Sequence, residues 1–183
     1  MLKRNLKKTI VGPVFFTKNN KLHYDYKDEN FFSEFIKFIF CAAPFGKNKL
    51  GKITSLGIAF NIDYNKKINL NFTEWLPGGC ILYHRKNSIL KFPFKYQNNK
   101  SYCEDIVHSF LRTQRNLRHY VVRESKIMTS KINYSDLNFC EIINEFKIRN
   151  NLLKYTKGNS LRFYIWCLFE IFNRIFKKFN PLR

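Results

Sequence analysis

Acidic residues are scarce in this sequence, and so are long apolar runs. Aspartate and glutamate number 13 against 33 lysines and arginines, which gives a formal charge of +20 over 183 residues. Such a charge favours anionic partners, namely nucleic acid, anionic lipid or phosphate-bearing small molecules. The apolar run Phe163 to Phe169 is far shorter than the roughly 20 residues that a transmembrane helix needs. The basic N-terminal segment lacks the small-residue cleavage site of a signal peptide.

Paired cysteines are also missing. The five cysteines are widely spaced and form no C-x-x-C pair: Cys41, Cys80, Cys103, Cys140 and Cys167. This spacing argues against a zinc site and against a dense disulfide framework. We therefore expect buried, reduced thiols in a cytosolic protein.

Apolar residues are abundant enough for a folded core. They make up 45% of the chain and include 20 phenylalanines, far more than disordered chains contain. At this length we expect one domain. Runs of β-branched and aromatic residues predict strands at Thr9 to Thr17, Ile68 to Phe72, Cys80 to Tyr83, His119 to Val122 and Lys126 to Met128, with an ambiguous strand-like run at Ile53 to Ile62. Helical spacing predicts helices at Phe31 to Cys41, Cys103 to Gln114, Asp136 to Tyr155 and Ser160 to Phe179. The mixture indicates an α/β protein.

Two of the predicted helices have very broad apolar faces. The segment Phe31 to Phe40 has almost no polar position, so we expect it to be buried on several sides or to pack on a membrane or a partner. The last helix is interrupted only by Glu170 and Arg174 on its apolar face. It either packs on the core or lies in a membrane interface, where the basic residues near its end would face anionic lipid.

The chain is organised around the stretch from Trp75 to Asp105, WLPGGCILYHRKNSILKFPFKYQNNKSYCED. Gly78 and Gly79 allow the backbone to approach another segment or a ligand closely, because no Cβ intervenes. Glu104 and Asp105 open the predicted helix, and a carboxylate in a first turn is held rigidly enough to act as a base. The alternatives remain open: the acidic pair stabilises the helix dipole, and the glycines make a tight turn beside a core tryptophan.

Several segments, in this order, resemble the family 2 glycosyltransferases, inverting enzymes of the GT-A fold. IVGPVF at residues 10–15 is similar to the strand that follows the family's nucleotide-binding half, and GKITSLG at residues 51–57 suits its acceptor-side loop. WLPGGCILYHR at residues 75–85 resembles its W-L-x-G-G-x-x-L-x-R-R segment, and CEDIVHSFLRTQRN at residues 103–116 resembles its E-D helix. FKIRNNLLKY at residues 146–155 is similar to an Arg-Asn segment near the end of many members.

The resemblance implies a role for each candidate site residue. Asp105 would be the catalytic base, with Glu104 orienting it or contacting the acceptor. Gly78 and Gly79 would let the acceptor sugar or the donor approach the backbone. Three further side chains would contact the substrates: Trp75 by stacking on a sugar, and His108 and Arg112 by facing the diphosphate. Without the resemblance, His108 and Arg112 belong to a solvated polar helix face.

The chain departs from the family pattern at the donor site. The family's nucleotide-binding half, with its Asp-x-Asp metal motif, would come before Thr9 and is absent from this sequence. Members also place a histidine on the strand after the E-D helix, where this chain reads KIMTSKI. We therefore expect the C-terminal half of a GT-A mixed sheet with helices, residues 1–134, followed by two helices in residues 135–183. Mg²⁺ or Mn²⁺ would bind only in the complete enzyme.

The leading hypothesis is a glycosyltransferase, or the acceptor-side half of one. It would transfer a sugar from a nucleotide-sugar donor to a lipid-linked, polysaccharide or lipopolysaccharide acceptor, in the cytoplasm or on the inner face of the membrane. A separate nucleotide-binding half would be its partner. A basic nucleic-acid-binding protein of ribosomal type is less favoured, since the basic residues are dispersed along the chain. An inactive glycosyltransferase remnant is the third alternative.

Overall fold

The computed structural model describes residues 6–18, 21–22, 30–62, 70–89, 103–129 and 139–179. Within these ranges the protein is a mixed α/β fold, in which a four-stranded sheet has the order β2-β4-β1-β3. The strands are β1 (Thr9–Thr17), β2 (Leu70–Thr73), β3 (Leu82–Tyr83) and β4 (Arg118–Thr129). The helices are α1 (Phe31–Cys41), α2 (Glu104–Gln114), α3 (Phe139–Thr156) and α4 (Ser160–Phe179), with short 3₁₀ turns at Leu6–Lys8, Gly46–Lys49 and Arg85–Asn87.

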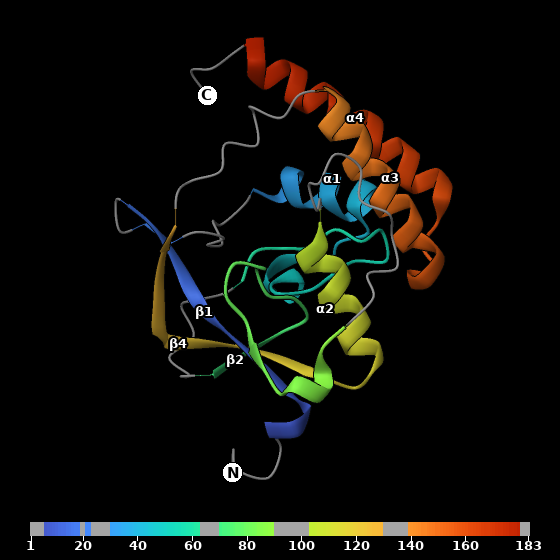
Figure 1. Ribbon diagram of the computed structural model, residues 1–183. Coiled ribbons are helices and arrows are strands. Elements are labelled where there is room, and N and C mark those ends of the chain that lie inside the picture. The colour runs from blue at the N-terminus through green and yellow to red at the C-terminus, as the bar shows by residue number, and fades with distance from the viewer. Residues whose placement is uncertain are drawn as a thin grey trace.

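The sheet combines parallel and antiparallel pairing. Its central pair, β1 and β4, is parallel, whereas β2 pairs antiparallel with β4 and β3 pairs antiparallel with β1. Figure 1 shows the sheet at one side of the molecule and α1, α3 and α4 grouped on the other, with α2 lying between them.

The single strand β4 replaces the two short strands that the sequence predicts. Its register with β1 shifts between Pro13, opposite Val122, and Val14, opposite Lys126, so that residues 123–125 bulge out of the ladder. Proline has no N–H to donate to a neighbouring strand, and a bulge lets pairing resume beyond it. The prediction of two strands was therefore wrong at this point, since the polar residues between them form the bulge.

Most other elements lie where the sequence predicts them. The bounds of β1, α1 and α4 agree, and α2 begins one residue after its predicted start. The ambiguous run at residues 53–62 is not a strand: Ile53 and Ala59 form one isolated bridge around a turn in which Gly57 has a φ of +69°. The expected boundary between residues 134 and 135 lies outside the described residues.

Two apolar cores connect these layers. One lies under the sheet and contains Ile10 and Val14 of β1, Val121 of β4, and Ile62, Trp75, Leu76 and Leu117. The other joins the helices through Phe146 and Leu153 of α3, Phe163 and Trp166 of α4, and Cys41, Ala43 and Leu56. Ile106 and Val107 of α2 pack on Ile148 and Leu152 of α3, so α2 links the sheet to the helical layer.

The turn between α3 and α4 needs a glycine. A Cβ on Gly158 would lie 2.2 Å from the carbonyl oxygen of Ser55, a backbone atom that cannot move aside cheaply. Asn159 then caps α4, because its side-chain oxygen accepts the N–H of Arg162 at 2.9 Å.

Burial differs from the sequence expectation at several apolar residues. In α1 only Cys41 is buried, whereas Phe31 and Phe32 are 76% and 70% exposed. Of the two alternatives expected for α1, burial on several sides was therefore wrong, and packing on a membrane or a partner stays a prediction. All five cysteines are free, but Cys80 and Cys140 are exposed, which corrects the expectation of five buried thiols. No helix in the described ranges combines the length and the apolar character needed to cross a bilayer.

Candidate functional site at the start of helix α2

Glu104 and Asp105 form the first turn of α2, and the apolar side of the helix fixes their position. The next two residues, Ile106 and Val107, are buried against α3. Cys103 precedes the helix in a left-handed conformation, with a φ of 54°. The Oδ1 atom of Asp105 accepts the backbone N–H of Ile106 at 2.8 Å. One oxygen of the carboxylate is thereby committed to the backbone.

The glycine turn lies directly against this acidic pair. A Cβ built on Gly78 would be 3.5 Å from both the Cβ of Asp105 and the Oε1 of Glu104. A hydrogen bond holds the glycine turn close to α2, because the Oγ of Ser109 on the helix accepts the N–H of Leu76 at 3.2 Å. Gly78 is itself exposed. Two segments that are distant in sequence therefore meet, and the space beside the carboxylates is kept free of a side chain.

Gly79 is exposed as well, and it faces β1. A Cβ there would lie 3.2 Å from the ring of Phe15, tighter than most real contacts. Neither glycine of the turn has a positive φ. Close packing therefore accounts for Gly79 against β1, whereas a Cβ at Gly78 would make only ordinary contact with α2, and neither position needs an unusual backbone conformation.

Burial and neighbouring charges act in opposite directions on Asp105. Loss of water around the carboxyl raises its pKa, while the N–H of Ile106 and the guanidinium of Arg149 partly offset that rise. Burial also raises the pKa of the neighbouring Cys103 thiol to about 12, so this cysteine stays protonated and unreactive at neutral pH. The carboxyl of Asp105 is thus the candidate proton acceptor in this turn.

A buried ionic network from α3 supports the site from behind. Arg149 donates to the Oε1 of Glu145 from its Nε at 3.0 Å and from its Nη2 at 2.9 Å, and its third nitrogen contacts the carbonyl oxygen of Gly57. Arg174 of α4 reaches the Oε2 of Glu145 at 3.3 Å. Burial opposes ionisation of Glu145, but the two arginines outweigh it and hold its pKa below the usual range.

Arg112 lies two turns after Asp105, and the structure corrects its expected exposure. The side chain is only 3% exposed, not part of a solvated helix face, and its guanidinium carbon lies 4.5 Å from the ring centre of Tyr83. Its Nε and Nη1 find no hydrogen-bond acceptor among the described residues. Burial lowers its pKa, and Tyr83 opposes this. A buried cation without a carboxylate partner is costly and suits an anionic ligand.

Two histidines lie near Arg112. His108 is half-buried on α2, where burial and the charge of Arg112 lower its pKa. His119 of β4 is 1% exposed, and its Nε2 has no hydrogen-bond partner among the described residues. Burial, with Arg112, lowers the pKa of His119 to about 4. The strand after the acidic helix therefore carries a histidine at its second position. The resemblance places the family's histidine further along this strand, in the segment KIMTSKI near Met128.

Trp75 is in the core and not at a sugar-binding surface. It is 4% exposed, and its Nε1 donates to the carbonyl oxygen of Phe60 at 2.8 Å. Its side chain belongs to the apolar core under the sheet. Trp75 therefore anchors the segment that leads into the glycine turn. Its buried ring offers no surface on which a sugar could stack.

The described residues do not fit a metal site. No group of three His, Cys, Asp or Glu side chains among them lies close enough together to hold an ion. Glu104 and Asp105 are the only acidic residues of the first turn of α2, and two neighbouring carboxylates are too few ligands for an all-protein cage.

Some residues of the site escaped sequence reasoning although a signal was present. Glu145 and Arg149 have the i, i+4 spacing of a helical ion pair. His119 and Val121 alternate with exposed or half-buried neighbours, so both point into the core from one face of β4. Tyr83 closes the predicted strand after the glycine turn, but nothing in its neighbourhood indicated that it covers Arg112.

Comparison of the chain with protein-family models, with curated proteins and with solved structures finds no match.

Proposed function

We propose that this chain is the acceptor-side half of an inverting glycosyltransferase of the GT-A fold. It transfers a sugar from a nucleotide-sugar donor to a polysaccharide or lipopolysaccharide acceptor, and a nucleotide-binding half supplies the donor site. The observation that carries the proposal is the contact between the exposed Gly78 turn and the carboxylates of Glu104 and Asp105. The mixed sheet with helices is compatible with this fold class.

In the proposed reaction Asp105 is the general base. Its Oδ2 takes the proton of the acceptor hydroxyl while that oxygen bonds to the anomeric carbon of the donor. The bond between the anomeric carbon and the diphosphate breaks on the opposite face, and the nucleoside diphosphate leaves with the electron pair. Burial favours the protonated product form of Asp105, which is what its raised pKa reflects.

Glu104 and Gly78 position the acceptor in this scheme. The Oε1 of Glu104 borders the space beside Gly78, where it can accept a hydrogen bond from a second sugar hydroxyl. Any side chain at position 78 would occupy that space. The absence of a Cβ thus gives the acceptor access to both carboxylates.

Arg112 supports the proposal from the donor side. Its buried guanidinium has two nitrogens without acceptors among the described residues, and a leaving diphosphate offers the anionic oxygens that they lack. His119 and His108 lie in the same electrostatic environment, since the charge of Arg112 lowers the pKa of each. We derive no step through a metal ion.

The test compares two acidic residues in matched positions. Asp105 and Glu141 each lie in the first turn of a helix, so neutralising either one removes the same favourable interaction with a helix dipole. The protein is purified from its source under native conditions, so that a partner half is retained. Release of nucleoside diphosphate is then measured with UDP-, GDP- and dTDP-hexoses and a membrane lipid extract as acceptor.

Asp105→Asn should lower nucleoside-diphosphate release by roughly 10²–10⁴-fold, the usual contribution of a general base. Glu141→Gln should keep the wild-type rate. The proposal is wrong if the native preparation releases no nucleoside diphosphate from any of these donors. It is equally wrong if Asp105→Asn and Glu141→Gln retain the same rate.

A further inference from the structure

Helices α1 and α4 expose apolar side chains that no described segment covers. On α4 the exposed ones follow helical spacing along the whole element: Leu161, Tyr164, Ile165, Leu168, Phe169, Phe172 and Ile175. The buried ones, Phe163, Trp166 and Cys167, are on the opposite side, facing the core. Because a surface helix normally places polar residues outward, this helix is apolar on both sides.

The exposed side of α1 continues this surface. It presents Phe31, Phe32, Phe35, Phe38 and Ile39, and Phe45 extends it by stacking on Phe38 with ring centres 4.7 Å apart. The two helices touch where Phe40 stacks on Phe169 with ring centres 5.7 Å apart. We call the exposed residues of α1 and α4, with Phe45, the α1–α4 face.

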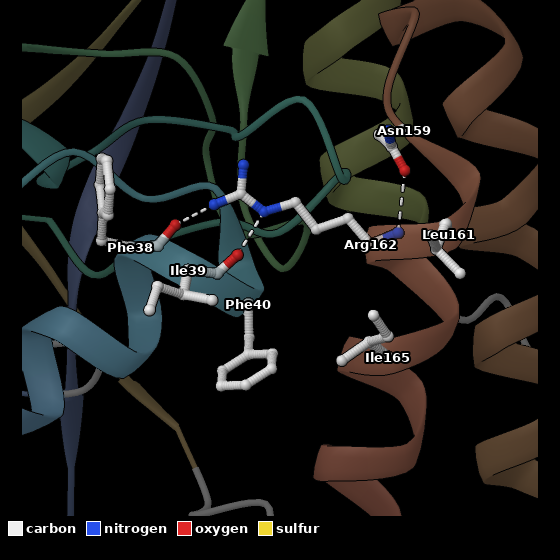
Figure 2. A pocket seen from close by; sticks show the side chains of 7 residues that line it. All are labelled: Phe38, Ile39, Phe40, Asn159, Leu161, Arg162 and Ile165. Carbon is white, nitrogen blue, oxygen red and sulfur yellow. Dashed lines mark hydrogen bonds between the residues drawn. The ribbon is translucent and has the colours of Figure 1, made fainter.

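A hollow joins the two halves of the α1–α4 face. It has a volume of about 370 Å³ and is lined by Phe38, Ile39, Phe40, Asn159, Leu161, Arg162 and Ile165. Figure 2 shows Arg162 reaching from α4 to the carbonyl oxygens of Phe38 and Ile39 at the end of α1. These contacts fix the guanidinium at the edge of a hollow that, apart from Asn159, is otherwise lined by apolar side chains. Its charge has no carboxylate partner among the described residues.

We propose that the α1–α4 face inserts into the interface of an anionic lipid bilayer, with Arg162 contacting a lipid phosphate. An apolar surface of this extent is rare on monomers and marks a docking site. A 20-residue helix is about 30 Å long, and lying flat it can place its whole exposed side among acyl chains. This inference stands on the exposed side chains and does not depend on sugar transfer.

Charge selects lipid over a second copy of the chain. Two copies, each with a formal charge of +20 over the whole chain, would repel one another, whereas an anionic leaflet attracts that charge. The only acidic residue of α1, Glu34, is paired with Lys49 at 3.1 Å, and the only one of α4, Glu170, is paired with Arg174 at 2.8 Å. No unpaired carboxylate of either helix would therefore face the lipid headgroups.

Basic residues also precede and follow the apolar part of α4 in the sequence. Lys154 and Lys157 are exposed near its start, and Lys177 and Lys178 follow in the sequence at its end. Basic residues at both ends of an apolar helix can contact headgroups while the middle inserts. Each contributes to attraction by an anionic leaflet, which falls off with salt.

The test is flotation with vesicles of 30% phosphatidylglycerol and 70% phosphatidylcholine at 0.1 M salt, compared with pure phosphatidylcholine. Wild-type protein should float with the anionic vesicles and bind the neutral ones at least tenfold more weakly. Phe172→Glu, at a side chain that is 68% exposed, should lower binding to anionic vesicles at least tenfold. Phe72→Glu is the matched control, because Phe72 is 61% exposed but lies on β2, and it should bind like wild type.

A fluorescence readout covers the case in which a charged variant fails to fold. Tyr164 is 55% exposed on the α1–α4 face, so the emission of Tyr164→Trp should shift to the blue on anionic vesicles. Phe72→Trp should not shift, and the two natural tryptophans are buried and contribute a constant background.

Three results would overturn the inference. The first is wild-type protein that does not float with anionic vesicles. If that protein is a dimer that Phe172→Glu dissociates, a second copy of the chain covers the α1–α4 face instead of lipid. Another is equal loss of binding in Phe172→Glu and Phe72→Glu, which indicates a general charge effect. The last is equal emission shifts in Tyr164→Trp and Phe72→Trp.

Discussion

Burial shifts two titratable side chains beside α2 towards their neutral forms. It raises the pKa of Asp105 and lowers that of His119 to about 4. Both shifts have the same physical cause, since a low-dielectric environment disfavours a charge. Sequence reasoning identified Asp105 through its place at a helix start, but the burial of His119 depends on β4 having a core on one side.

The protonation of His119 should make the fold sensitive to acid. Between the ordinary pKa of 6.5 and the native pKa of about 4, the unfolded chain binds a proton that the folded chain does not. Stability is therefore complete above pH 6.5 and is lost as the pH falls towards 4, by roughly 3 kcal/mol for this group. The nearby charge of Arg112 also lowers the pKa of His119 and so adds to the loss of stability in acid.

Urea unfolding at a series of pH values measures this effect. His119→Gln should lose less unfolding free energy than wild type between pH 6.5 and 4, by up to roughly 3 kcal/mol. His84→Gln, at an exposed histidine, should follow the wild-type curve. Parallel curves for wild type and His119→Gln would show that the buried imidazole does not titrate in this window.

At the scale of elements, α3 is the connector between the site and the helical layer. Its Glu145 and Arg149 form an ion pair within the helix, and Arg174 brings α4 into the same network. The i, i+4 spacing makes the pair predictable from sequence, but its burial and its link to α4 require the tertiary structure. The charge of Arg149 also lowers the pKa of Asp105, so a side chain of α3 influences the protonation of the candidate base.

Breaking this network at its centre should be costly. Glu145→Gln leaves the buried guanidinium of Arg149 without a full counter-charge, and we expect a loss of about 3 kcal/mol in unfolding free energy. Glu170 is paired with Arg174 nearer the surface, so Glu170→Gln should cost about 1 kcal/mol or less. Urea unfolding at neutral pH compares the two, and equal losses would contradict the central place of Glu145.

The sequence predicts an element well where local apolar spacing determines it, and poorly where a distant segment does. The bounds of β1, α1 and α4 follow from local apolar spacing. The single bulged β4 does not, because Pro13 acts on it from a neighbouring strand. The sequence left the exposure of α1 open for a similar reason, since an apolar pattern does not say which neighbour covers it.

At the scale of the whole molecule, two surfaces have different characters. The Gly78 turn and the first turn of α2 form the proposed acceptor site, and the α1–α4 face is the proposed membrane surface. Figure 1 places α2 between the sheet and the other helices. Sequence order alone could not bring Gly78 to Asp105, because this contact depends on the packing of α2 through Ser109.

The proposed base, Asp105, would be held in its position at the expense of stability. A carboxylate that only stabilises a helix start strengthens the fold, whereas a half-buried carboxylate whose pKa is raised by desolvation weakens it at neutral pH. The two roles therefore predict opposite effects of the same substitution on the whole protein.

The most direct measurement takes melting temperature and nucleoside-diphosphate release on one preparation of Asp105→Asn at pH 7. We expect release to fall by roughly 10²-fold or more while the melting temperature rises above that of wild type. A melting temperature that falls, with release unchanged or reduced only in proportion to the folded fraction, would show instead that Asp105 is a structural residue of the helix start.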